Sequence, residues 1–93
     1  MSASRMNITA VRLTQDSAVQ FSVYGPGWGY RAYSISPHVI CEELGAANTN
    51  PRQISLAFEL GKPRILKAVQ SGAGTLGMDG RMILAATDFR VQH

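Results

Sequence analysis

The chain has 93 residues, a net charge of +3 and a pI of about 9.5, with 45% hydrophobic and 16% charged residues. This length allows one domain with a modest core, and the hydrophobic content argues against a disordered chain. No apolar run approaches the ~18 residues of a membrane span, the first ten residues lack the apolar segment of a secretory signal, and one cysteine excludes an internal disulfide. We therefore expect a single cytoplasmic domain over residues 1–93, with disorder at residues 1–5 and 90–93.

The N-terminal part of the chain predicts strands. Residues 6–13 are rich in β-branched side chains, and the TQDS that follows at residues 14–17 is typical of a turn. Residues 18–25 alternate between apolar and polar side chains with the period of a half-buried strand. The apolar side of this strand consists of Val19, Phe21 and Val23.

The GPGWG at residues 25–29 predicts a chain reversal, because glycine accepts positive φ and proline favours a turn corner. Residues 30–36 then return as the partner strand. Arg31, Tyr33 and Ile35 share one side of it, and the alternation does not decide which side faces inward.

Residues 36–45 predict a short helix. Ser36 is a good N-cap, Pro37 suits the first helical position and Gly45 favours a stop. The apolar stripe between them consists of Pro37, Ile40, Cys41 and Leu44.

Residues 51–71 predict further helix, with Asn50 as N-cap and Pro51 at the first position. Gly61 and Pro63 interrupt it, since Pro63 lacks a donor and its ring crowds the preceding turn. The alternatives are one kinked helix or two short helices that rest on the same surface.

The remaining segment predicts a glycine-rich connection at residues 71–80, a buried strand at residues 81–87 and a tail anchored by Phe89. The whole pattern indicates an α+β fold. We expect a small antiparallel sheet, made of the N-terminal hairpin strands plus a C-terminal strand, with two or three helices packed on one face. The predicted core is Val19, Phe21, Val23, Ile35, Ile40, Leu44, Ile54, Phe58, Ile65, Val69, Ile83 and Leu84.

His38 and Cys41 are tempting as a catalytic or metal-binding pair. Nucleophilic catalysis would need a third group to orient the imidazole, and a metal would need three or four ligands. The only other histidine is the terminal His93. We therefore interpret this segment as a helix without chemistry and expect no catalytic residues, no metal and no cofactor.

Residues 72–77 spell G-x-G-x-x-G. The dinucleotide-binding fingerprint requires a strand before this motif and a helix after it, whereas here we expect a helix before and a strand after. We interpret these glycines as a flexible connection.

Two groups of residues raise the question of nucleic acid. Trp28, Tyr30 and Tyr33 with Arg31 could stack on a base or a peptide, although packing and cross-strand pairing account for them as well. The basic residues are spread along the chain, and those proposed as nucleic-acid contacts are Arg52, Lys62, Arg64 and Lys67.

Three stretches in order, YSISPHVICEELGA, LAFELGKPRILKAV and DGRMILAATDF, resemble the bacterial family called domain of unknown function 1488. The resemblance covers residues 35–89. Gly61 and Pro63 interrupt the pattern, and the family commonly has acidic or polar residues where this chain has His38 and Cys41. The matching positions are Ile35, Ser36, Leu44, Gly45, Ala57, Phe58, Ile65, Ala68, Asp79, Gly80, Ile83, Leu84, Asp88 and Phe89.

The resemblance implies a small bacterial α+β protein and carries no assigned activity, cofactor or catalytic residue. We expect a non-enzymatic binding or regulatory module whose partner is another protein or a second copy of itself, because an exposed sheet edge invites pairing. The alternative is a weak nucleic-acid-binding protein that uses the basic residues of the second helix. We expect no interaction with membranes.

Overall fold

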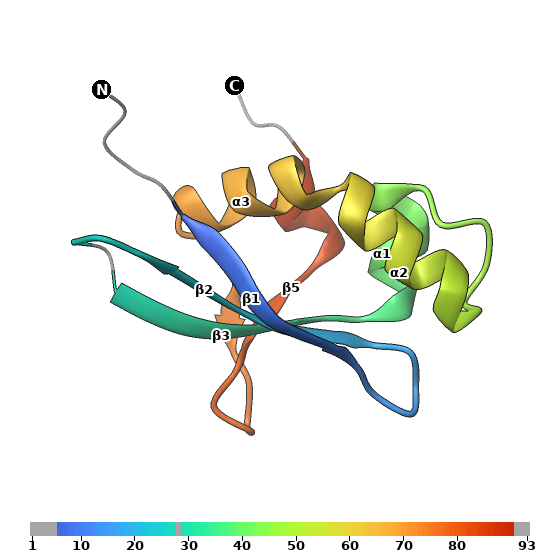
Figure 1. The fold of residues 1–93 in the computed structure, drawn as a ribbon, viewed down its shortest axis with the longest axis horizontal. Coiled ribbons are helices and arrows are strands. Elements are labelled where there is room, and N and C mark those ends of the chain that lie inside the picture. The colour runs from blue at the N-terminus through green and yellow to red at the C-terminus, as the bar shows by residue number, and fades with distance from the viewer. Residues whose placement is uncertain (1–5, 28, 91–93) are drawn as a thin grey trace.

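The computed structural model describes residues 6–27 and 29–90 (Figure 1). The sequence predicts disorder at residues 1–5 and 90–93. Of these, Arg90 is described and pairs with Glu43, whereas residues 1–5 and 91–93, like Trp28, lie outside the described residues. The elements in chain order are β1 (Asn7–Leu13), β2 (Val19–Gly25), β3 (Gly29–Ile35), α1 (Pro37–Leu44), α2 (Pro51–Leu60), α3 (Lys62–Gln70), β4 (Thr75–Leu76), β5 (Met82–Leu84) and the 3-10 helix η1 (Ala86–Phe89).

The predicted α+β class is confirmed, and the five strands form one sheet in the order β1-β2-β3-β5-β4. Strands β1, β2 and β3 form an antiparallel meander. The sheet is mixed rather than wholly antiparallel, because β5 pairs parallel to β3. The chain leaves β3 through the helices and returns alongside it in the same direction, as a parallel connection requires. The short antiparallel strand β4 was not predicted.

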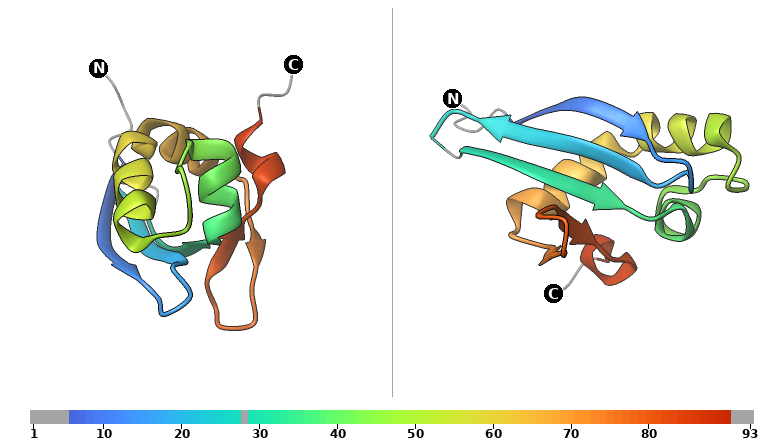
Figure 2. Two further views of the ribbon diagram at one scale, coloured as in Figure 1. Left: turned by 90° about the vertical axis from the view of Figure 1, so that its right-hand side faces the viewer. Right: turned by 90° about the horizontal axis from the view of Figure 1, so that it is seen from below.

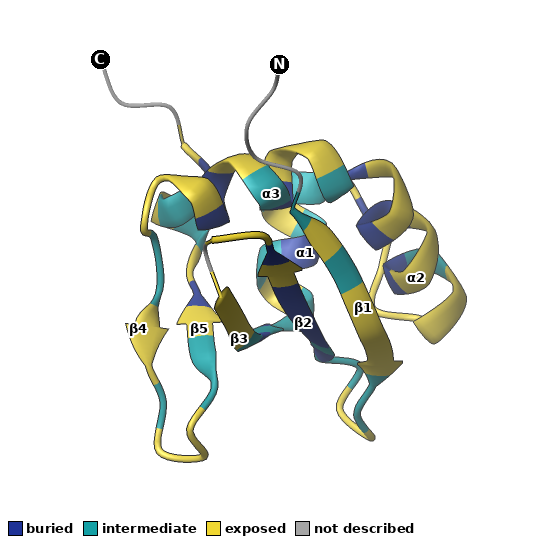
Figure 3. Cartoon of the chain, turned by 60° about the vertical axis from the view of Figure 1, so that its left-hand side comes forward, coloured by how far each residue is buried: buried dark blue, intermediate teal, exposed yellow. Residues whose placement is uncertain are grey.

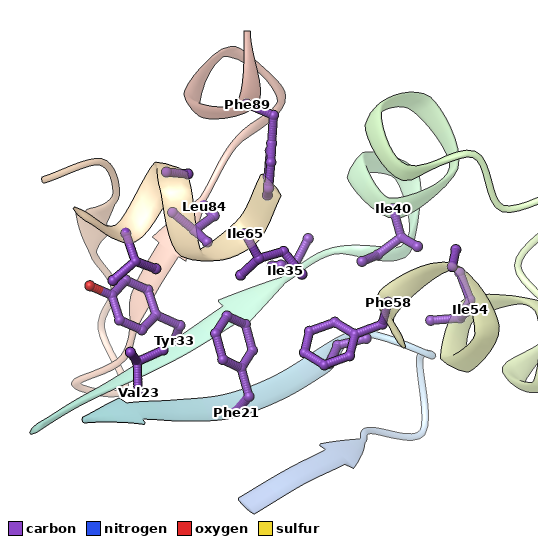
Figure 4. Close-up of a cluster of buried hydrophobic side chains, with 14 of the residues drawn as sticks. Phe21, Val23, Tyr33, Ile35, Ile40, Ile54, Phe58, Ile65, Leu84 and Phe89 are labelled. Atoms are coloured by element: carbon purple, nitrogen blue, oxygen red, sulfur yellow. The ribbon is translucent and has the colours of Figure 1, made fainter. Parts of the chain in front are cut away.

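All helices lie on one face of the sheet, as expected (Figures 1 and 2). The core fills the space between the two layers (Figure 4). At its centre the ring of Phe21 stacks on Tyr33 with 5.6 Å between centroids and lies 5.2 Å from Phe58. These three rings therefore join β2, β3 and α2.

The helix boundaries follow the caps that the sequence contains. The Ser36 hydroxyl accepts a hydrogen bond from the Val39 amide at 3.3 Å, and the Asn50 side chain accepts one from the Arg52 amide at 2.9 Å. Gly45 ends α1 with a φ of +85°. This left-handed backbone conformation favours glycine, because glycine has no Cβ atom to clash.

Residues 51–70 form two short helices that meet at Gly61 rather than one kinked helix. Gly61 lies against α1, because a Cβ atom built on it would come within 2.7 Å of Leu44 Cδ2. Ile54 and Phe58 of α2 and Ile65 of α3 are all buried, so both helices pack on the same core, as predicted.

Ten of the predicted core residues are buried, and two are not. Ile83 is 46% exposed, so its prediction as a core residue is wrong. The pairing of Ser34 with Ile83 puts Ile83 on the sheet face opposite to Leu84. Leu44 is half-buried at the rim of the core. Tyr33, only 1% exposed, is a core residue that the alternation left undecided.

Both edges of the sheet have features that limit strand pairing. Strand β1 contains a bulge between Thr9 and Arg12, where Ala10 has a φ of +55°. Strand β4 has only two residues. Bulges and very short strands are common ways to protect a sheet edge from pairing with another chain.

Candidate functional site

The sheet has one face under the helices and one face without them (Figure 2). We call the second one the open face. Strand register assigns its residues, because neighbouring side chains in a strand point to opposite sides. Figure 3 shows that the edge strands β1 and β4 are largely exposed. The open face comprises Asn7, Thr9, Arg12, Gln20, Ser22, Tyr24, Tyr30, Ala32, Ser34, Thr75 and Ile83.

Two tyrosines stand side by side on the open face. Tyr24 and Tyr30 are direct partners in the register of β2 and β3, and they are 45% and 66% exposed. The Tyr30 hydroxyl donates a hydrogen bond to the Ser22 hydroxyl at 2.9 Å. Since Ser22 lies two residues back along β2 from Tyr24, this bond holds the phenol of Tyr30 over the sheet.

Two arginines lie on the same face of the sheet as the tyrosines. Arg12 on β1 donates from Nε to the Gln20 side chain at 3.0 Å. Arg81 precedes Met82, so the alternation places it on the side of Ile83. Its guanidinium donates to the main-chain oxygens of Phe21 at 3.3 Å and Tyr33 at 3.2 Å, which brings its charge over the middle of the sheet.

The strands contain no carboxylate. All five strand segments are described, and none includes an aspartate or a glutamate. The open face therefore combines exposed aromatic rings, hydroxyl groups and positive charge with no acidic residue of its own strands. The sequence signal for this was the absence of acidic residues from the predicted strands together with the Tyr24 and Tyr30 positions.

The structure places the four basic residues predicted as nucleic-acid contacts on the helix side. Arg52 lies in the first turn of α2, and Lys62, Arg64 and Lys67 lie on α3. Lys62 pairs with Glu59 at 2.9 Å, and Arg64 pairs with Glu43 at 3.6 Å. Arg64 and Lys67 border one cavity, whereas Arg52 borders a separate polar depression at the start of α2.

His38 and Cys41 occupy the helix that was predicted for them. His38 is exposed, and Cys41 is half-buried and packs against the core. Within residues 6–27 and 29–90, no group of three histidine, cysteine or acidic side chains could hold a metal ion. His93 and Trp28 lie outside the described residues.

The G-x-G-x-x-G stretch has the predicted surroundings. It follows α3 and includes β4, so a helix precedes it and a strand lies within it. This order is the reverse of what a dinucleotide-binding fingerprint needs.

Tyr33 is a titratable residue buried on the core side of the sheet. Burial raises the pKa of its phenol above 10.0, and the nearby Arg31 partly offsets this rise. Because a buried phenolate would lack water, the neutral form is the one that the fold stabilises.

Among the described residues, no helix has the length and apolar character to cross a membrane. Comparison with protein-family models, with curated proteins and with solved structures found no match to this chain. The resemblance to domain of unknown function 1488 therefore stays a prediction from the sequence.

Proposed function

We propose that the protein is a non-enzymatic binding module that holds single-stranded nucleic acid on the open face of its sheet. The observation that carries this proposal is the pair Tyr24 and Tyr30 on a surface with two arginines and no strand carboxylate. Exposed aromatic rings stack on unpaired bases, and arginines attract the phosphates.

The distance between Arg12 and Tyr24 on the open face suits an extended single strand of nucleic acid. Arg12 is the register partner of Gln20, and Tyr24 lies four residues further along β2, a distance of about 13 Å at the usual rise per residue. A short oligonucleotide can therefore reach the stacking rings and a cation at once. Arg81, near Phe21, lies between these two points along the strand.

Electrostatics favours this ligand over a second copy of the same face. An interface between two open faces would contain Arg12 and Arg81 of both copies and no carboxylate from the strands to offset their charge. Like charges that meet without partners oppose association. A polyanion instead supplies the charge that the face lacks.

The test is the anisotropy of a labelled single-stranded oligonucleotide, with the duplex as a control. Stacking on aromatic side chains contributes about 1–3 kcal/mol per base, so we expect Tyr30→Ala to weaken binding by about 5- to 150-fold. Arg12→Gln should also weaken binding and reduce its dependence on salt between about 50 and 200 mM. The matched control, Lys62→Gln, changes a cation on the helix side.

Two results would contradict the proposal. Absence of binding at low salt rejects nucleic acid as the ligand. Binding that Lys62→Gln weakens while Tyr30→Ala does not would move the contact to the helix side, where the sequence first suggested it.

A second candidate function is self-association through α2. Leu56 and Leu60 are separated by one helical turn on its outer side and are 52% and 74% exposed. Arg52 and Glu59 flank Leu56 on the same side, so two antiparallel copies of α2 would bring Arg52 of one copy near Glu59 of the other, which already pairs with Lys62 of its own chain. Sedimentation of the wild type and of Leu60→Lys tests this: a concentration-dependent dimer that the substitution abolishes supports it, and a monomer throughout rejects it.

A further inference from the structure

A cavity of about 430 Å³ lies between α3 and η1, on the helix side of the sheet. Its position makes it independent of the open face and of the proposed function. The apolar part of its lining comes from Ala68, Ala73 and Phe89. Small-molecule sites commonly have volumes of about 300–1,000 Å³ and predominantly apolar walls, so this cavity suits a small ligand.

Within the described part of the chain, three cations border the cavity: Arg64, Lys67 and Arg90. Two of them pair with the same carboxylate. Glu43 Oε1 lies 3.6 Å from Arg64 Nη2, and Glu43 Oε2 lies 3.2 Å from Arg90 Nη2. Arg64 also donates to the Phe89 carbonyl oxygen at 3.1 Å. These contacts fix both guanidinium groups in the wall of the cavity.

Lys67 is different. Among the described residues, its ammonium group takes part in no ion pair and no hydrogen bond. Asp88 also borders the cavity, and its carboxylate accepts a hydrogen bond from the Ala85 amide at 2.7 Å at the start of η1. Counted over the described residues, three cations face the carboxylates of Glu43 and Asp88, which leaves one positive charge in excess, and we assign it to Lys67.

We propose that this cavity binds a small monocarboxylate with an apolar body. The carboxylate meets the ammonium group of Lys67, and the apolar body lies against Phe89, Ala68 and Ala73. A single excess charge matches a monoanion, whereas a phosphate dianion would leave one negative charge uncompensated beside Asp88. The apolar part of the lining favours a ligand with a hydrocarbon body over a purely polar anion, which would gain nothing from contact with it.

The experiment is a titration of the full chain followed by amide NMR, with hexanoate as probe and hexanol and inorganic phosphate as matched comparisons. We expect hexanoate to cause saturable shifts at Ala68, Ala73 and Phe89. Because Lys67 is exposed and exposed ion pairs contribute about 0.2–1 kcal/mol, Lys67→Gln should weaken hexanoate binding by about 1.4- to 5-fold. Lys62→Gln, on the same helix but paired with Glu59, should leave it unchanged.

Four outcomes would overturn the proposal. Absence of saturable shifts means that the cavity does not take this ligand. Equal affinity for hexanol means that the site recognises only the hydrocarbon body, and stronger binding of phosphate means that the ligand class is wrong. Equal loss in the Lys67 and Lys62 variants would show a nonspecific effect of charge.

Discussion

Replacement of Phe58 by alanine gives the sharpest test of the core. The side chain is 1% exposed and packs 5.2 Å from Phe21, with the two rings tilted by 58°. Truncating a buried phenylalanine costs about 3–5 kcal/mol, since apolar contact is lost and a cavity remains. A chain of 93 residues has a total stability of about 5–14 kcal/mol, so the substitution removes a large share of it.

Urea unfolding followed by circular dichroism measures this loss. With an m-value of about 1.5 kcal/mol/M, a cost of 4 kcal/mol lowers the unfolding midpoint by about 2.7 M. Phe58→Leu, which keeps most of the volume, should cost less than about 1.5 kcal/mol and stays measurable if the alanine variant does not fold. The control is Leu60→Ala, because Leu60 is 74% exposed.

A loss below 1 kcal/mol for Phe58→Ala would refute the three-ring arrangement of Phe21, Tyr33 and Phe58. A loss of equal size for Leu60→Ala would show that the exposed face of α2 is covered by a partner, as the second candidate function requires. An unchanged m-value is needed for both readings, since m reports the surface exposed on unfolding.

Three further predictions concern single side chains. Because the pKa of Tyr33 is raised in the folded state, its neutral phenol contributes stability that is fully present below pH 10.0 and is lost as the pH rises through the folded-state pKa. Urea unfolding at a series of alkaline pH values should therefore show a falling free energy of unfolding, and Tyr33→Phe should remove this fall. Gly45→Ala should lower stability by about 1–2 kcal/mol in thermal unfolding, because its φ is +85°, and no loss would contradict that backbone conformation. Glu43→Gln should cost about 1 kcal/mol at low salt and less at high salt, since its partners Arg64 and Arg90 are half exposed, and a cost that does not depend on salt would argue against these ion pairs.

The open face shows why the functional surface was only partly predictable. The sequence places Tyr24 and Tyr30 on either side of a hairpin and contains no acidic residue in its predicted strands. Strand register made those two tyrosines neighbours, and the position of the helices left their face uncovered. The four basic residues chosen from the sequence share a region of the chain, yet the break at Gly61 leaves Arg52 on α2 and the other three on α3. Carboxylates also pair with two of them, Glu59 with Lys62 and Glu43 with Arg64.

Local chemistry along the chain determined where most elements begin and end. Ser36 and Asn50 cap their helices because each side-chain oxygen satisfies a main-chain amide within the same turn. The alternation of Val19, Phe21 and Val23 likewise predicts one buried side of a strand without knowledge of its neighbours.

The tertiary structure alone decided which side of β3 and β5 is buried and in which direction β5 runs. An alternating strand has two sides, and only its pairing with another strand assigns one of them to the core, as it does for Tyr33 and against Ile83. The direction of β5 depends on the path through three helices, which is a long-range property of the chain. Contacts between residues a few positions apart can be predicted from the local sequence, whereas contacts between distant segments depend on how the whole chain packs.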